Sequence, residues 1–136
     1  MSILNKIRGA LETHLNGMSG VPTTFYSNVY YDPDPNTTFL KVTFVPTTKG
    51  PVTKGLNPWV KYEGFFSILV CTPEGNGTGD SLELADTILD RFASTTDISF
   101  DGIIVTISSS RIAPDYFSAP FNCQPIMIDW YIHHTN

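Results

Sequence analysis

Hydrophobic residues near the start of the chain recur at steps of three and four, which predicts an amphipathic helix. Leu4, Ile7, Leu11 and Leu15 would share one stripe along this helix. The pair Asn16-Gly17 would end it, because glycine and asparagine are favoured just beyond a helix C-terminus.

A second amphipathic helix is predicted after a glycine-containing turn at 73–79. Asp80 would be its N-cap, and Glu83, three residues later, would complete a capping box. The apolar positions of this helix would face the core; they are Ala85, Ile88, Leu89 and Phe92.

Alternating apolar and polar residues predict four main strands, because side chains of a strand point to opposite faces in turn. These strands are 39–45, 59–71, 102–108 and 126–133. Paired strands separated by a helix indicate an α+β fold, with an antiparallel sheet of about four main strands and two α-helices packed on one face. The expected organisation is one domain over 1–136, with 46–58 as a projecting hairpin loop.

Aromatic residues in segments without helical periodicity are candidates for contacts with other proteins. The region 17–36 is rich in proline and glycine and is expected to be a stiff extended arm. Tyr30 and Tyr31 lie in this arm, and Trp59 follows the hairpin loop. We take all three as candidate interface residues.

The hairpin loop is basic, although the whole chain has a net charge of −5. Lys49 and Lys54 stand next to glycines in the loop and are further candidate interface residues. They would contact a neighbouring acidic subunit, where opposite charge sets register more than affinity. The alternative is an exposed loop without a role.

Composition argues against several functional classes. No stretch gathers several Lys or Arg, so the electrostatic pattern of a nucleic-acid-binding protein is missing. The first residues do not follow a signal-peptide pattern, and no apolar run approaches the ~20 residues that span a bilayer. Charged residues make up 15% of the chain, against roughly 25% in typical soluble domains, which suggests a surface partly covered by partners.

Residues that often form metal sites are not grouped in this sequence. Cys71 and Cys123 stand far apart and are expected to be reduced, partly buried thiols. His133 and His134 are adjacent on a predicted strand, so their side chains would leave opposite faces. We therefore assign no metal and no cofactor.

Two short motifs contain residue types that occur in catalytic or ligand-binding sites. The glycine-rich segment 75–79 precedes a helix, but Asp80 follows it where a phosphate loop needs lysine. Asp32 and Asp34 would face the same way in an extended arm and could do acid–base work or bind calcium. A solvated turn stiffened by prolines is the preferred interpretation, and no catalytic residue is assigned.

The central part of the chain resembles a known family. The run 59–70, the turn 73–79 and the helical stretch 84–92 are similar to the tail terminator proteins of long-tailed bacteriophages. The matching residues would be turn and packing positions and carry no catalytic role; they are Tyr62, Gly64, Gly77, Gly79, Ala85, Asp86 and Phe92.

This resemblance implies a structural virion protein that is not an enzyme. The expected assembly is a homo-oligomeric ring of six copies, mounted on the tail tube at the head-proximal end of the tail. The ring would stop tube polymerisation and bind a head-side connector or stopper protein. DNA would pass through its channel without specific binding, and assembly would take place in the host cytoplasm, away from any membrane.

Two other interpretations remain open at this stage. One is another head–tail joining or tail-completion protein, such as a stopper or a minor tail component. The other is a small cytosolic enzyme or ligand-binding module, for which Asp32 and Asp34 would be the first residues to examine.

Overall fold

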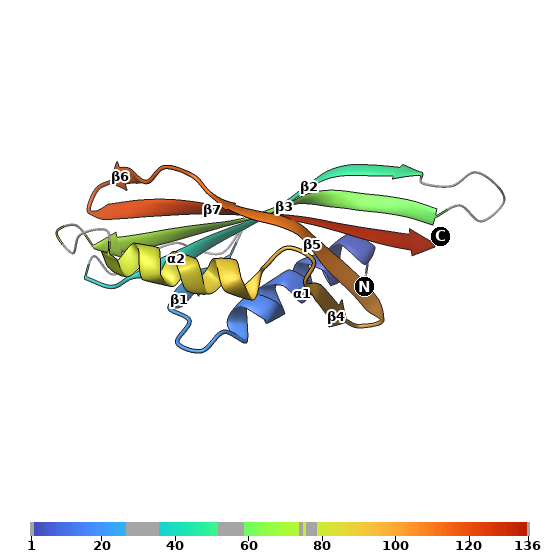
Figure 1. The fold of residues 1–136 in the computed structure, drawn as a ribbon, viewed down its shortest axis with the longest axis horizontal. Coiled ribbons are helices and arrows are strands. Elements are labelled where there is room, and N and C mark those ends of the chain that lie inside the picture. The colour runs from blue at the N-terminus through green and yellow to red at the C-terminus, as the bar shows by residue number, and fades with distance from the viewer. Residues whose placement is uncertain (1, 27–35, 52–58, 74, 76–78, 136) are drawn as a thin grey trace.

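The computed structural model describes residues 2–26, 36–51, 59–73, 75 and 79–135, which form two helices and a seven-stranded mixed sheet (Figure 1). The strand order is β1-β2-β3-β7-β5-β4, and β6 pairs with β7. Both helices lie on the same side of the sheet (Figure 1). The α+β class is confirmed. The expectation of a purely antiparallel sheet with about four strands is wrong, because β1 and β2 are parallel and three short strands are added.

The first helix, α1 (Ile3–Asn16), begins at Ser2, whose hydroxyl accepts a hydrogen bond from the Asn5 backbone N–H at 3.3 Å. One stripe of α1 is buried as expected, and it consists of Ile7, Ala10, Leu11 and Leu15. Leu4 shares the helical spacing but is 38% exposed. Periodicity defines the stripe, whereas the elements packed on it decide how far along the helix it is covered.

The second helix, α2 (Gly79–Arg91), starts two residues earlier than an N-cap at Asp80 predicts. Asp80 therefore lies in the first turn and is not the N-cap, and residues 76–78, which precede the helix, lie outside the described part. An acidic residue in the first turn still stabilises a helix, because it faces the positive end of the helix dipole. The buried side of α2 carries Ala85 and Ile88, whereas Leu89 is only half-buried.

Two long strands form the middle of the sheet. They are β3 (Trp59–Pro73) and β7 (Phe121–Thr135), which pair antiparallel along their full lengths. On their outer sides lie β2 (Phe39–Pro51) and β5 (Ile103–Ile112). All four strands are longer than predicted.

Part of the loop predicted at 46–58 belongs to β2, so the strand predicted at 39–45 was too short. The sequence predicts that the strand ends at Val45, before Pro46, but β2 continues to Pro51. Proline is tolerated here because the side of β2 away from β3 has no partner strand around Pro46 among the described residues. The part of the loop at 52–58 lies outside the described residues.

Three short strands were not predicted: β1 (Thr23–Phe25), β4 (Asp97–Phe100) and β6 (Tyr116–Ser118). Three or four residues are too few to show an alternating pattern. The expected extended arm is confirmed only where β1 pairs with β2, since residues 27–35 lie outside the described part.

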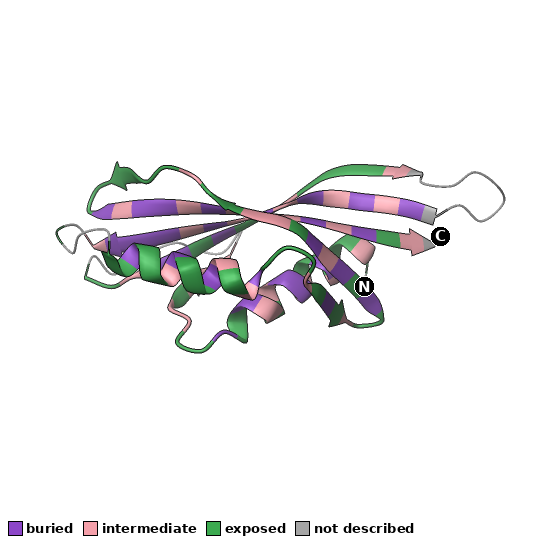
Figure 2. Ribbon diagram, in the orientation of Figure 1, coloured by how far each residue is buried: buried purple, intermediate pink, exposed green. Residues whose placement is uncertain are grey.

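The main core lies between the sheet and the two helices, and Figure 2 shows buried residues alternating with more exposed ones along β3 and β7. A smaller hydrophobic cluster consists of Phe39, Cys71, Phe121 and Cys123. Cys71 and Cys123 are opposite each other on β3 and β7 and form a disulfide. The expectation of two separate reduced thiols is therefore wrong, because the fold brings together residues that are 52 positions apart.

Candidate assembly surfaces

Three strands project toward one end of the long axis of the molecule (Figure 1). They are the segments 48–51 of β2, 59–63 of β3 and 131–135 of β7, and we call them the strand extension. The extension has three strands because the pairing of β5 with β7 ends at Thr106 and Tyr131.

Lysine side chains lie over aromatic rings on the strand extension. The Nζ atom of Lys49 lies 5.4 Å from the ring centroid of Tyr62, and the Nζ atom of Lys61 lies 5.3 Å from that of Tyr131. Lys61 also pairs with Glu63, with 3.5 Å between Nζ and Oε2. Exposed contacts of this kind are weak, so both ammonium groups stay available to a partner.

The structure places only some of the predicted interface residues. Lys49 is exposed and lies in β2, not in a loop. Trp59 is the first residue of β3, although its side chain is not described. Lys54, Tyr30 and Tyr31 lie outside the described residues, so their roles remain predictions.

Two β-bulges lie at the same level of the sheet, on either side of the central strand pair. Thr47 is the extra residue on β2 and Ser108 the extra residue on β5. Between them, Gly64 of β3 pairs with Trp130 of β7. Bulges increase local twist, and we call this line of four residues the crease.

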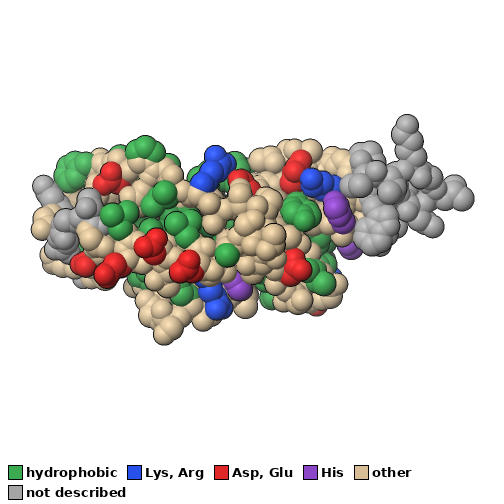
Figure 3. Space-filling model, viewed as in Figure 1, with side chains coloured by type: hydrophobic (Ala, Val, Ile, Leu, Met, Phe, Trp, Pro, Cys, Tyr) green, Lys and Arg blue, Asp and Glu red, His purple; other side chains and the backbone are tan. Residues whose placement is uncertain are grey.

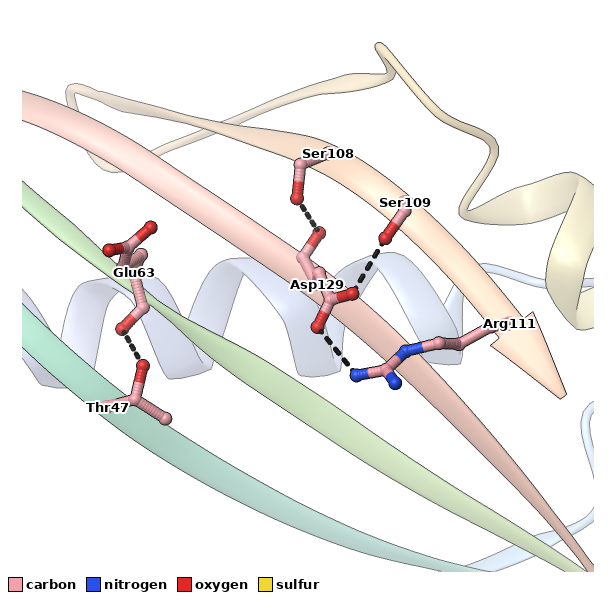
Figure 4. A network of polar contacts seen from close by, with 6 residues as sticks. All are labelled: Thr47, Glu63, Ser108, Ser109, Arg111 and Asp129. Carbon is pink, nitrogen blue, oxygen red and sulfur yellow. Dashed lines mark hydrogen bonds and ion pairs between the residues drawn. The ribbon is translucent and has the colours of Figure 1, made fainter. Parts of the chain in front are cut away.

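Hydroxyl groups stabilise the crease on both sides (Figure 4). Thr47 Oγ1 donates a hydrogen bond to the Glu63 carbonyl oxygen at 3.1 Å, and Ser108 Oγ donates to the Asp129 carbonyl oxygen at 3.1 Å. The Asp129 carboxylate accepts a hydrogen bond from Ser109 Oγ at 2.7 Å and lies 3.4 Å from an Arg111 nitrogen.

A shallow hollow of about 290 Å³ lies along the crease. Its lining includes Glu63, Phe65 and Asp129. Both carboxylates already have partners within the chain, Lys61 for one and Ser109 for the other. The hollow therefore lies where the two bulges interrupt the sheet, and its carboxylates are engaged within the chain.

A different surface covers the outward side of α2. Glu83, Asp86 and Asp90 are exposed there, and we call these three residues the acidic face. Figure 3 shows acidic side chains in a row over α2, with hydrophobic side chains beside them. Large hydrophobic residues are exposed on α2, on the end of β5 and on β6; they are Leu82 (46%), Ile112 (44%), Tyr116 (48%) and Phe117 (58%).

His14 has a structural contact at the junction of the two helix ends. Its Nε2 atom donates a hydrogen bond to the Arg91 carbonyl oxygen at 2.8 Å, and Arg91 Nε donates to the His14 carbonyl oxygen at 3.0 Å. Burial lowers the pKa of His14 below its usual value near 6.5, and the contact with the Arg91 carbonyl only partly offsets this effect.

Within the ranges that the structure describes, no three His, Cys, Asp or Glu side chains gather closely enough to hold a metal ion. In the same ranges, neither helix combines the length and the apolar character that a bilayer crossing requires. Asp32 and Asp34 lie outside the described residues.

The sequence was then compared with known proteins. A family model described as phage tail terminator protein matches residues 6–130. The chain belongs to the phage tail terminator family. It is therefore a structural protein of the phage tail, which agrees with the resemblance found in the central part of the sequence.

One solved structure is similar to this tail terminator family member over 97% of its chain and 96% of the other, with a TM-score of 0.76 and 17% sequence identity. At this identity the likeness shows the fold alone. A comparison with curated protein sequences found no match.

The family match spans most of the surfaces described above. It includes Lys49, Lys61, the whole of α2 and the whole of β6, and it ends just before the final residues of β7. Sequence reasoning missed the exposed residues Tyr116 and Phe117. Their signal was an adjacent aromatic pair in a proline-interrupted stretch, where no buried face was expected.

Proposed function

We propose that this protein forms a ring on the end of the phage tail tube, stops tube polymerisation and provides the attachment face for the head-side connector. One observation supports the ring beyond family membership: the strand extension and the acidic face lie toward opposite ends of the long axis (Figure 1). The described part of the extension carries Lys49 and Lys61 against one carboxylate, Glu63, whereas the acidic face carries three carboxylates. Contacts between two different surfaces are head-to-tail, and they generate rings when the rotation closes.

Six copies is the number expected for this ring from the resemblance to long-tailed phage terminators. The site of action would be the head-proximal end of the tail, with assembly in the host cytoplasm. DNA would pass through the channel without specific binding. The net charge of −5 supports this part of the proposal, because like charges repel the phosphate backbone.

The test is tube polymerisation with purified tail tube protein, in the presence and absence of the terminator. We expect shorter tubes and a ring-shaped density at one end in electron micrographs. Binding along the sides of the tubes, or no effect on their length, would contradict the proposal. Binding to isolated connectors without any effect on tubes would instead favour the role of another head–tail joining protein.

The same micrographs count the copies in the ring through its rotational symmetry. A symmetry other than sixfold would correct the stoichiometry and leave the terminator role intact. A structure of the ring would identify the residues that line its channel. A channel lined mainly with Lys and Arg would contradict the expected passage of DNA without specific binding.

A further inference from the structure

Among the described residues, the acidic face of α2 has no cationic partner. Glu83, Asp86 and Asp90 lie three and four residues apart, so their carboxylates are neighbours on the helix surface. Like charges at these spacings destabilise a helix. No described lysine or arginine lies within ion-pairing distance of the three side chains.

Exposed hydrophobic residues accompany the acidic face. Leu82, which precedes Glu83 on α2, is 46% exposed. Figure 3 shows hydrophobic side chains beside the acidic row in the same view. Neighbouring exposed apolar groups mark protein interaction sites more often than isolated ones do. The charge and the apolar area together favour a protein partner over a small cation.

The strand extension has the opposite character. Lys49 and Lys61 lie on its two faces, and Glu63 is the one acidic residue among its described positions. Lys49 is on the face of Tyr62, whereas Lys61 is on the face of Glu63 and Tyr131. A cation is therefore available on either face of the extension.

We infer that the strand extension of one copy docks on the acidic face of the next copy, with one of its two lysine-bearing faces against Glu83 and Asp86 and the other face turned away. This inference rests on the proposed ring and specifies which surfaces close it. The occupant is a second copy of this chain, because charge complementarity lies within one molecule, between surfaces at opposite ends of its long axis (Figure 1). Because the two surfaces lie toward opposite ends of the molecule, they cannot contact each other within one copy.

Edge-to-edge pairing through β2 is a weaker explanation for contacts of the extension. The outer edge of β2 contains Pro46, a bulge at Thr47 and Pro51. Proline cannot donate a ladder hydrogen bond, and bulges bend an edge away from a partner. The exposed edge of β2 is thus protected against strand addition, whereas β7 beyond Tyr131 has no strand on its outer side among the described residues.

The inference is tested with two charge-reversed variants of the full chain. K49E/K61E makes both surfaces negative, and E83K/D86K makes both positive. Each variant alone should associate at least about tenfold more weakly than the wild type in sedimentation velocity at low salt. An equimolar mixture should recover association, since each variant then offers the surface that the other lacks.

Two further variants control for net charge. The variant K49E/K61E/E83K/D86K keeps the wild-type charge of −5 and exchanges the two surfaces, so it should associate like the wild type. R8E/K41E has the same charge change as K49E/K61E at exposed positions outside both surfaces, and it should associate normally. Circular dichroism checks that every variant is folded.

Three results in sedimentation velocity would overturn the docking. The wild type could remain monomeric at every protein concentration measured, or K49E/K61E or E83K/D86K alone could associate as strongly as the wild type. The equimolar mixture could also associate no more strongly than either variant alone. The tube assay separates this outcome from failure of the proposed function. If the charge-reversed variants still stop tube growth, the docking surfaces are wrong and the terminator role stands. If the charge exchange behaves as described but the wild type leaves tubes unchanged, the docking stands and the terminator role is wrong.

Discussion

Gly64 on β3 lies directly opposite Trp130 on β7, and a Cβ atom on Gly64 would come within 2.9 Å of Cζ2 of the indole. The same Cβ would lie 2.8 Å from the Cα atom of Pro46 on β2. Trp130 also stacks on Phe44, with 5.3 Å between ring centroids and 11° between ring planes. Three strands therefore approach one another at a position that only glycine can occupy.

Gly64→Ala should destabilise the protein by about 1–3 kcal/mol, the usual cost of forcing extra atoms into a packed site. Urea unfolding followed by circular dichroism measures the change. Gly50→Ala is the matched control, because Gly50 lies in β2 and a Cβ there would meet nothing within 4 Å. If both substitutions cost the same, the close approach at Gly64 does not matter to stability.

The disulfide between Cys71 and Cys123 predicts that no free thiol is detected, even after unfolding in the absence of a reductant. Both cysteines are almost fully buried on neighbouring strands. Reduction should then release two thiols and lower the free energy of unfolding by about 2–4 kcal/mol. Thiol titration and urea unfolding, with and without reductant, measure both effects. Two free thiols before reduction would restore the original expectation of a reduced pair.

The lowered pKa of His14 predicts that stability decreases as the pH falls below about 6.5. The unfolded chain binds a proton at His14 more readily than the folded chain, because burial disfavours the imidazolium. The contribution of neutral His14 to the free energy of unfolding is complete above the pKa of His14 in the unfolded chain. It is lost as the pH falls through the pKa of His14 in the folded chain. Histidine protonation therefore favours unfolding.

The measurement compares the free energy of unfolding at pH 8 and pH 5 in the wild type and in His14→Gln. Glutamine retains a hydrogen-bond donor but does not titrate. The wild type should lose more stability than the variant between the two pH values. Equal losses would mean that His14 does not contribute to the pH dependence.

The contacts of Asp129 predict unequal costs for two substitutions at the crease. Ser109→Ala removes a part-buried hydrogen bond of 2.7 Å and should cost about 1 kcal/mol. Arg111→Ala removes an ion pair of 3.4 Å whose arginine side chain is 61% exposed, and it should cost less than about 0.5 kcal/mol. Thermal and urea unfolding of both variants decide the order, and a larger loss for Arg111→Ala would reverse this interpretation.

Long, regular patterns in the sequence predicted the main elements correctly. The helical stripe through Ile7, Leu11 and Leu15 and the alternation along β3 and β7 reflect burial of one face of each element. Burial of one face places apolar residues at helical spacing in a helix and at alternate positions in a strand. Because the two spacings differ, the sequence distinguishes the two kinds of element. The α+β class follows from the same patterns.

Short strands and distant pairs were not predictable in this way. β6 has three residues and no buried face of its own, so Tyr116 and Phe117 gave no periodic signal. Of the candidate interface residues, the structure describes only the side chain of Lys49, which it moves from a loop into a strand. The acidic face was visible in the sequence as the outward side of α2 and Lys49 as part of a basic hairpin, but their separation toward opposite ends of the molecule was not.

The sequence by itself determined where the helices and central strands lie, which residues face the core, and the resemblance to phage tail terminators. Only the tertiary structure decided the partner of Cys71, the need for glycine at position 64, and the separation of Lys61 from the acidic face. The physical reason is that periodicity depends on near neighbours along the chain. Contacts between strands depend on register and bulges, which are set by the packing of the whole sheet.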